Sequence, residues 1–211
     1  MSNKLAKEYW EKKAGDNPTP TTIKVNAVND FTQIDADFIM KYASNDSVIL
    51  DLASGTGLTI NKYYEKVGRI VAVELCKQFS DFIVKSPKIE VVNCDLANFD
   101  TDERFDIVNM FGIVSYFDEK EIIGLYRKYK SYLKSTGRLL IKNQFGVNDD
   151  VVVNGYSEEL KMNYYSEYRH LDKEVEILKN VGYKDIQVID IYPPEANRWT
   201  NTHFYAIVAN L

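Results

Sequence analysis

The 211-residue chain has few of the features that mark metal-binding, membrane-spanning or secreted proteins. It has only two cysteines, Cys76 and Cys94, and neither belongs to a C-x-x-C pair or has histidine partners at metal-ligand spacing. No apolar run approaches the ~20 residues that cross a bilayer, and the N-terminus lacks a signal-peptide core. We therefore expect a cytoplasmic protein with reduced thiols, no bound metal and no membrane contact.

The chain also lacks a basic region that would bind nucleic acid. Its formal net charge is −5, and lysine and arginine are scattered without a polybasic run. No internal repeat or low-complexity segment divides the sequence, and its length suits one domain over residues 1–211. The composition thus favours a small-molecule partner and leaves the oligomeric state open. Abundant Lys, Asn, Ile and Tyr are typical of low-GC bacterial genomes.

The most informative segment is an apolar run followed by a glycine-containing loop. Val48–Leu52 reads as a buried parallel strand, and the loop after it contains Gly55 and Gly57. A strand, a glycine turn and a helix N-terminus are the parts with which open α/β sheets hold nucleotide-like cofactors. Glycine suits this loop because a Cβ would block close approach of a ligand or forbid a left-handed turn.

Acidic residues at three strand ends narrow the choice of cofactor. The loop has neither the G-x-G-x-x-G pattern nor the lysine of a phosphate-binding loop, and Asp51 would repel a pyrophosphate but attract an ammonium or sulfonium cation. Glu74 ends the next strand near the ~20-residue spacing at which an acid meets ribose hydroxyls. Asp95 follows the third strand, where it can accept from an adenine amino group or cap the start of a helix. The pattern suits one adenosine with an amino acid tail and no phosphate.

The ordered runs VILDLASGTG, VAVEL, VVNCDLANF and FDIVNMFGIVSYF resemble the motifs of class I S-adenosylmethionine-dependent methyltransferases. The resemblance covers Phe31 to Leu211 and implies S-adenosylmethionine as cofactor and S-adenosylhomocysteine as product. Family members usually have glycine where this chain has Ala53, and we expect alanine to be tolerated there at negative φ. The expected cofactor-binding residues are Asp51, Ala53, Gly55, Gly57, Glu74, Leu75, Asp95, Leu96, Asn109, Phe111 and Trp10.

The order of elements predicts the fold. Strands near Ile70, Val91, Ile107 and Leu140 alternate with helical segments, which implies a parallel sheet with helices on both faces. Two further strands, 186–191 and 204–209, are joined without a helix and should form an antiparallel hairpin at the sheet edge. We expect a Rossmann-like, doubly wound, seven-stranded α/β/α sandwich with an antiparallel C-terminal strand.

Helix signals mark three segments. A capping box at Asp30–Gln33 precedes a helix with apolar residues from Phe31 to Tyr42. A second box at Asp118–Glu121 opens a helix whose apolar stripe reaches Leu133 and which Gly137 is expected to end. The third helix starts at Leu171 and closes at Gly182. Residues 147–157 read as irregular, with a further helical stretch opening near Ser157.

The acceptor pocket should draw on the loops after the strands, on residues 1–30 as an N-terminal helix and lid, and on an insert at 147–170. His170 and His203 are candidate catalytic bases, since either could take a proton from an acceptor hydroxyl. Each also has a structural interpretation, His170 as the cap of the following helix and His203 as a packed strand residue. The candidate substrate-binding residues are Tyr9, Lys13, Asn143, Tyr165, Tyr168, Arg169 and Arg198.

Arg169 and Arg198 could each clamp a phosphate or carboxylate of the acceptor. No Asp/Asn cluster follows the fourth strand, which disfavours metal-assisted catechol-type transfer, and the segment Asn109–Gly112 lacks the Asn-Pro-Pro-Tyr-like motif of enzymes that methylate DNA bases. The tyrosines at 164–168 have a core or surface interpretation as well, and Tyr9 and Trp10 fit an amphipathic helix equally.

The resemblance favours methyl transfer to an oxygen or nitrogen of a small molecule, with phosphorylated or nucleotide-linked precursors of surface polysaccharides as one acceptor class. Three alternatives stay open. The first is a nicotinamide-dependent oxidoreductase, which Asp51 and the missing G-x-G-x-x-G oppose. The second is a sensor or scaffold that binds the cofactor without catalysis. The third is a methyltransferase acting on a protein or RNA.

Overall fold

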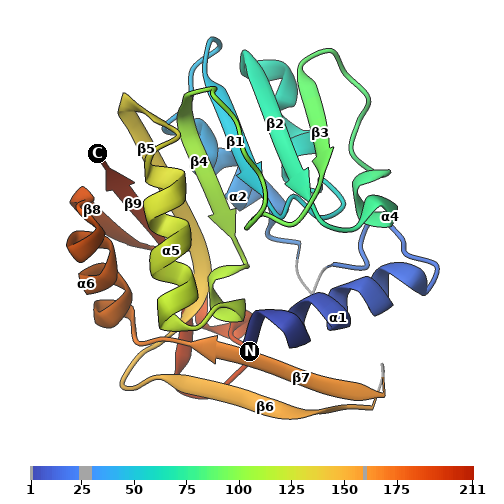
Figure 1. Ribbon diagram of the computed structural model, residues 1–211. Coiled ribbons are helices and arrows are strands. Elements are labelled where there is room, and N and C mark those ends of the chain that lie inside the picture. Colours follow the sequence, from blue (N-terminus) through green and yellow to red (C-terminus); the bar gives the residue numbers. More distant parts are fainter. Residues whose placement is uncertain (1, 24–29, 159–160) are drawn as a thin grey trace.

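The computed structural model describes residues 2–23, 30–158 and 161–211. Its centre is a seven-stranded sheet with the order β3-β2-β1-β4-β5-β9-β8, in which β9 runs antiparallel to both neighbours and the other pairs are parallel (Figure 1). This is the predicted Rossmann-like α/β/α sandwich. The sheet strands are β1 (Val48–Leu52), β2 (Arg69–Glu74), β3 (Ile89–Asn93), β4 (Phe105–Phe111), β5 (Leu133–Gly146), β8 (Lys184–Asp190) and β9 (Thr202–Asn210).

Helices cover both faces of the sheet because its central strands are apolar on both sides. On one face, α5 (Glu119–Lys130) and α6 (Leu171–Val181) pack against one set of strand residues (Figure 1). On the other face, α2 (Thr32–Met40) and α3 (Ile60–Tyr63) pack against the alternate set. The remaining helices are α1 (Ser2–Gly15), α4 (Lys77–Ser80) and the short 3₁₀ turns at Tyr64–Lys66, Val114–Tyr116 and Pro194–Ala196.

The predicted helix boundaries at Asp118, Leu171 and Gly182 hold, and the end predicted at Gly137 is wrong. Asp118 and Glu121 form a complete capping box on α5, and Gly182 closes α6 at φ 95°. However, α5 ends at Lys130, and Gly137 lies within β5, where an added Cβ would stand 2.8 Å from the Phe105 carbonyl. The predicted apolar stripe of this helix reached Leu133 because Leu133 is the first residue of β5, and its apolar side chain happened to fit the helical spacing.

The box predicted at Asp30–Gln33 does not form. The Asp30 carboxylate accepts from the backbone N–H of Thr32, only two residues away (3.0 Å), and the amide of Gln33 donates to Asp37 (2.8 Å). The helix itself is present as α2. Asp30 therefore makes a local turn before the helix and does not cap its first turn in the predicted way.

The insert at 147–170 contains a β-hairpin where a helical stretch was expected. Its strands are β6 (Val151–Ser157) and β7 (Met162–Tyr168), which pair antiparallel from Val151 opposite Tyr168 to Ser157 opposite Met162. The hairpin lies beside α1 beyond the carboxyl ends of β1–β4 (Figure 1). Helix α1 and the hairpin thus border the end of the sheet at which ligands bind in open α/β folds.

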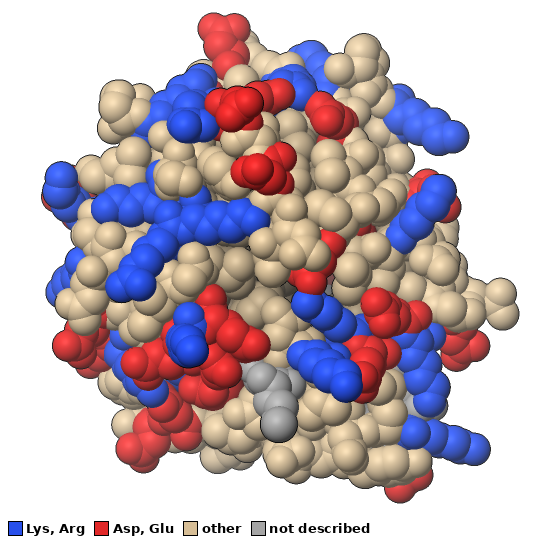
Figure 2. All heavy atoms as spheres, viewed as in Figure 1, with Lys and Arg blue, Asp and Glu red and all other residues tan. Residues whose placement is uncertain are grey.

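The surface carries charged side chains of both signs. Basic and acidic side chains intermingle on the face shown in Figure 2. No helix in the part of the chain that the structure describes is long and apolar enough to cross a membrane.

Candidate active site

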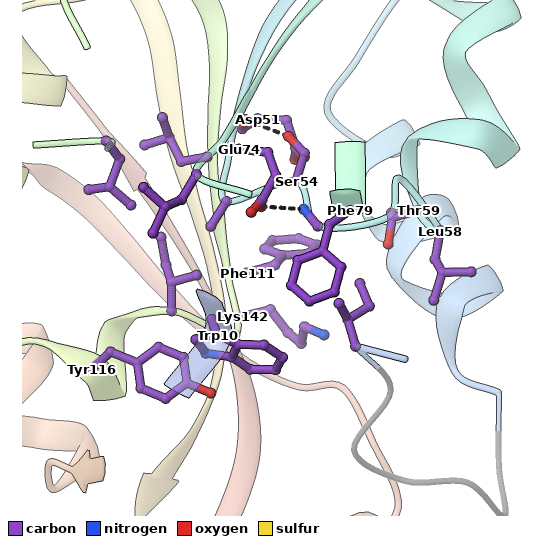
Figure 3. A pocket seen from close by; sticks show the side chains of 18 of the residues that line it. Trp10, Asp51, Ser54, Leu58, Thr59, Glu74, Phe79, Phe111, Tyr116 and Lys142 are labelled. Atoms are coloured by element: carbon purple, nitrogen blue, oxygen red, sulfur yellow. Dashed lines mark hydrogen bonds between the residues drawn. The ribbon is translucent and has the colours of Figure 1, made fainter. Parts of the chain in front are cut away.

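A cavity of about 360 Å³ opens at the carboxyl ends of the central strands. Figure 3 shows Asp51 and Glu74 above Phe111, with Trp10 and Lys142 below it. The residues expected to bind the cofactor that line this cavity are Trp10, Asp51, Ala53, Gly55, Glu74, Leu75, Asp95, Leu96 and Phe111. Motifs that are spread along the sequence from Asp51 to Phe111 are therefore brought to one site.

The two glycines of the cofactor loop both require the left-handed region. Gly55 has φ 56° and Gly57 has φ 71°. A Cβ on Gly55 would stand 2.6 Å from Ile23 Cδ1, and one on Gly57 would stand 2.7 Å from Ile83 Cγ1. Both conformation and space therefore exclude larger residues, as the sequence pattern indicated.

Ala53 departs from the expected conformation. Its φ is 55°, whereas we expected alanine to be accommodated at negative φ. A non-glycine residue in the left-handed region pays a steric penalty of roughly 1–2 kcal/mol. The glycine usual in related sequences is thus explained by backbone geometry, and this chain carries strain at the centre of its cofactor loop.

We expect Ala53→Gly to stabilise the protein. Glycine removes a strain of roughly 1–2 kcal/mol from the folded state. It also increases the conformational entropy of the unfolded chain, which lowers the free energy of unfolding by about 0.4–1 kcal/mol. The net gain in the free energy of unfolding should be about 0.5–1 kcal/mol by urea denaturation. Ala43→Gly, at a position without positive φ, is the control and should lower stability. A loss of stability in Ala53→Gly would contradict the strain assignment.

Asp51 is held in the wall of the cavity as a buried carboxylate. Its Oδ1 accepts from the Asn109 side chain (3.1 Å), and the Ser54 hydroxyl donates to its backbone carbonyl (2.9 Å). Burial raises the pKa of Asp51 to about 6, and the hydrogen bonds from Ser54 and Asn109 oppose that shift. Asn109 itself is completely buried and does not line the cavity. Its predicted cofactor contact is therefore corrected to a positioning role behind Asp51.

Glu74 links the loop to the end of β2. Its two carboxylate oxygens accept from the backbone N–H groups of Gly55 (2.8 Å) and Cys76 (2.9 Å). Burial raises its pKa, and these backbone donors counteract the shift. The side chain lines the cavity between the loop and Leu75. Glu74 therefore fixes the loop conformation while facing the space where a ribose would lie.

Asp95 lies at the third strand end and meets the N-terminal helix. Its Oδ1 accepts from the backbone N–H of Ala97 (2.9 Å), and its Oδ2 pairs with Lys7 of α1. The Trp10 ring lies edge-on to Phe79 and to Tyr116, at 6.1 Å between centroids in each case. Helix α1 therefore covers this end of the cavity with Lys7 and Trp10, both of which line it. The remainder of the predicted lid, at 24–29, lies outside the described residues.

Arg169 is a structural residue and not an acceptor clamp. Its side chain is 1% exposed, and its Nε donates to the carboxylate of Glu174 (2.6 Å), which is fully buried. The other guanidinium nitrogens donate to the carbonyls of Phe117 (2.6 Å) and Val114 (3.0 Å). Every one of these partners is internal, so Arg169 joins the hairpin to α6 and to the turn after β4.

Neither histidine reaches the cavity. The Nε2 of His170 donates to the Val147 carbonyl (2.9 Å), and the residue is the N-cap of α6. The ring nitrogens of His203 lie 2.7 Å from Asp190 Oδ1 and 3.1 Å from Asn197 Oδ1. Neither lines the cavity. The proposed roles as bases are therefore corrected. His203 is a packed strand residue, as its structural interpretation had it, whereas His170 occupies the N-cap position of α6 without a capping hydrogen bond from its side chain.

The remaining predicted substrate residues divide between the cavity and its surroundings. Arg198 lines the cavity, but Asn143 is buried beside it and donates to the Gln144 carbonyl (2.8 Å). Tyr168 accepts from the Trp199 indole (3.1 Å) within the hairpin region. The cavity is not lined by Tyr9, Lys13 or Tyr165 either. Tyr9 instead packs against Tyr164, with 5.1 Å between ring centroids, and so joins α1 to the hairpin.

Sequence reasoning missed a polar group at the far end of the cavity. Asp35 on α2, Lys142 on β5 and Tyr192 after β8 all line it and contact one another. The rings of Phe31 and Phe204 lie beside Tyr192. No motif marks this group, because its three members lie far apart in the chain. The one available signal was Lys142, a charged residue within an apolar strand.

Residues 49–137 match a family profile described as a methyltransferase domain. This part of the chain is therefore similar to a methyltransferase domain. The matched residues hold the glycine loop and the strand-end acids, and the strand order completes the fold expected from the motif resemblance. S-adenosylmethionine is the methyl donor of this class. No curated protein matches the chain at a significant level.

Solved structures resemble the fold of the chain over most of its length. DhpI in complex with SAH is 15% identical with a TM-score of 0.75, covering 99% of this chain and 96% of its own. The glycopeptide N-methyltransferase MtfA complexed with S-adenosyl-L-methionine is 15% identical at a TM-score of 0.68, with coverages of 92% and 100%. The Burkholderia thailandensis 1,6-didemethyltoxoflavin-N1-methyltransferase is 15% identical at 0.70, with coverages of 98% and 87%. At these identities the likeness shows the fold.

Proposed function

We propose that the protein transfers a methyl group from S-adenosylmethionine to an oxygen or nitrogen of a small anionic molecule, with phosphorylated or nucleotide-linked precursors of surface polysaccharides as the class to test first. One observation carries the proposal. A single cavity joins the acids Asp51 and Glu74 at one end to the Asp35–Lys142 ion pair at the other, and Arg198 also lines it. Donor and acceptor would thus occupy one continuous space.

The residues at the first end fit the cofactor. Asp51 is a buried carboxylate suited to an ammonium group, and Glu74, which lines the same cavity, would accept from the ribose hydroxyls. Apolar side chains of Leu75, Phe79 and Leu96 line the space near Asp95 and suit an adenine ring. When bound, S-adenosylmethionine supplies an electrophilic methyl group, so these residues need only hold and orient it.

The residues at the Lys142 end of the cavity suit catalysis in which the protein aligns the acceptor with the methyl group and removes no proton from it. With both histidines bonded elsewhere, no imidazole of the described chain reaches the cavity to take a proton. An acceptor oxygen that is already anionic needs no base. Holding reactants in line can itself lower a barrier by ~7–11 kcal/mol. Lys142 inside the cavity and Arg198 at its wall are the cations available to hold such an acceptor.

We expect affinity for S-adenosylmethionine to fall as the pH drops from 7 to 5. The pKa of Asp51 is about 6, so below this pH the carboxyl becomes neutral and loses its attraction for the cofactor's ammonium group. The loss should approach about tenfold per pH unit well below the pKa. Calorimetric titrations across this range measure it. Asp51→Asn should bind weakly at every pH, and an unchanged slope in this variant would contradict the assignment.

The raised pKa of Asp51 also makes the stability of the folded protein depend on pH. The folded-state pKa of Asp51 lies above its ordinary value of 3.8, so between pH 3.8 and about 6 the folded protein binds more protons than the unfolded chain. Its contribution to stability is therefore present at low pH and is lost as the pH rises through that window.

The function is tested by incubating the protein with trideuteromethyl S-adenosylmethionine and a panel of sugar phosphates and nucleotide sugars. Each is paired with its dephosphorylated counterpart, and mass spectrometry detects the added label. We expect label in one or more phosphorylated members and much less in their neutral counterparts. Equal labelling of both would contradict an anionic acceptor. Cofactor binding without transfer to any member of this or a peptide and RNA panel would favour a sensor or scaffold.

A further inference from the structure

Three side chains form a closed hydrogen-bonded group at the acceptor end of the cavity. The ammonium of Lys142 lies 2.9 Å from Asp35 Oδ2 and 3.1 Å from the Tyr192 hydroxyl oxygen. The Tyr192 hydroxyl lies 2.5 Å from Asp35 Oδ1. The Lys142 and Asp35 side chains are 13% and 8% exposed, so the group is largely shielded from water while each member lines the cavity.

The hydrogen-bond roles within the group leave one donor for a ligand. Burial and the Asp35 carboxylate raise the pKa of Tyr192, so its hydroxyl stays protonated and donates to Asp35. A lysine ammonium carries three donors, of which Lys142 uses one on Asp35 and one on Tyr192. No further partner of the Lys142 ammonium is found among the described residues, so its third N–H is the donor that this group can offer to a ligand in the cavity.

The surroundings of Lys142 strengthen a bond to an anion. Its ammonium lies 5.3 Å from the Phe111 ring centroid and 5.1 Å from that of Tyr192. Such apolar walls lower the local dielectric and make a charge-assisted hydrogen bond stronger than in water. A second acid at this end, Asp30, accepts from the Thr32 backbone N–H (3.0 Å), and its negative charge opposes an anion, so the lysine N–H has to provide the attraction. Figure 3 shows Lys142 on the opposite side of Phe111 from Asp51 and Glu74.

We propose that Lys142, held in place by Asp35 and Tyr192, anchors the methyl acceptor by donating a hydrogen bond to an anionic oxygen, a carboxylate or a phosphate, of a molecule that lies against Phe111. This inference rests on the proposed function and names the part of the acceptor that is recognised. Asp35 and Tyr192 are positioning residues because they act through the lysine. Phe111 separates the anchor from the acids at the cofactor end.

The test uses protein saturated with S-adenosylhomocysteine and titrates benzoate, phenyl phosphate and the neutral analogue benzamide by calorimetry. Benzoate and phenyl phosphate separate carboxylate from phosphate recognition. The variants are Lys142→Met and the double variant Asp35→Asn with Lys142→Met, which leaves no unpaired charge if the single variant folds poorly. Lys134→Met is the matched control, because Lys134 also lies on β5 but pairs with Asp106 and does not line the cavity.

We expect the unaltered protein and the Lys134→Met control to bind at least one anionic probe ten or more times more tightly than benzamide. Both Lys142 variants should lose this preference while binding S-adenosylhomocysteine with unchanged affinity. Retained preference in both variants, or no preference in the unaltered protein, would overturn the role of Lys142 and leave the proposed function standing. Failure of the unaltered protein to bind S-adenosylhomocysteine would overturn the proposed function itself.

Discussion

Glu74→Ala is expected to weaken S-adenosylmethionine binding by at least about 100-fold, equivalent to about 2.7 kcal/mol. The carboxylate accepts from the Gly55 and Cys76 backbone N–H groups and lines the cavity where the ribose is expected. Each hydrogen bond to a charged group contributes about 1.5–3 kcal/mol. Alanine removes the ribose contact and also frees the loop from β2, so both effects act on the cofactor.

Calorimetric titration measures the affinity, and thermal unfolding shows whether each variant is folded. Glu74→Gln keeps an acceptor oxygen for the loop and should bind more tightly than the alanine variant but more weakly than the unaltered protein. Glu90→Ala is the matched control, since Glu90 lies on neighbouring β3 but is half exposed and pairs with Arg69. Cofactor affinity in Glu74→Ala equal to that of the unaltered protein would show that the site is wrongly assigned.

Arg169→Met is expected to lower the free energy of unfolding by about 3–5 kcal/mol, the cost of breaking a buried ion pair. Among the described residues, the change leaves the fully buried Glu174 carboxylate with the Tyr126 hydroxyl as its one side-chain partner. It also leaves the carbonyls of Phe117 and Val114 without their guanidinium donor. The uncompensated charge accounts for most of the loss, because an isolated buried carboxylate is costly to desolvate.

Urea denaturation measures this loss. Arg198→Met, at an exposed position, should stay within about 0.5 kcal/mol of the unaltered protein. Adding Glu174→Gln to Arg169→Met should restore part of the stability, since the buried charge is then removed. An Arg169→Met protein of full stability that failed only in acceptor binding would return this arginine to the role of a clamp.

The cofactor end was predictable from the sequence because its determinants are local. A buried strand, a glycine loop and an acid at each strand end occur together in short segments, and parallel pairing brings those ends to one edge. The exception is Ala53, since its positive φ follows from the path of the loop and not from its own preference. Asn109 was placed at the correct strand end, but its side chain points to Asp51.

The acceptor end was not predictable, because burial and long-range contacts decide it. Asp35, Lys142 and Tyr192 come from three elements that meet only in the folded chain. Arg169 looked available to a ligand, but Glu174, five residues later, takes its guanidinium. The tyrosine-rich segment Met162–Tyr168 was not recognised as a strand, because its pairing with β6 depends on a neighbour that also lacks a clear period-2 pattern.

The most direct test of the central claim is calorimetric titration of the protein with S-adenosylmethionine, S-adenosylhomocysteine and NADH. A cavity lined by Asp51 and Glu74, without a phosphate-binding loop, should bind the first two at micromolar concentration and leave NADH unbound. Binding of NADH alone would contradict the methyltransferase assignment and favour an oxidoreductase.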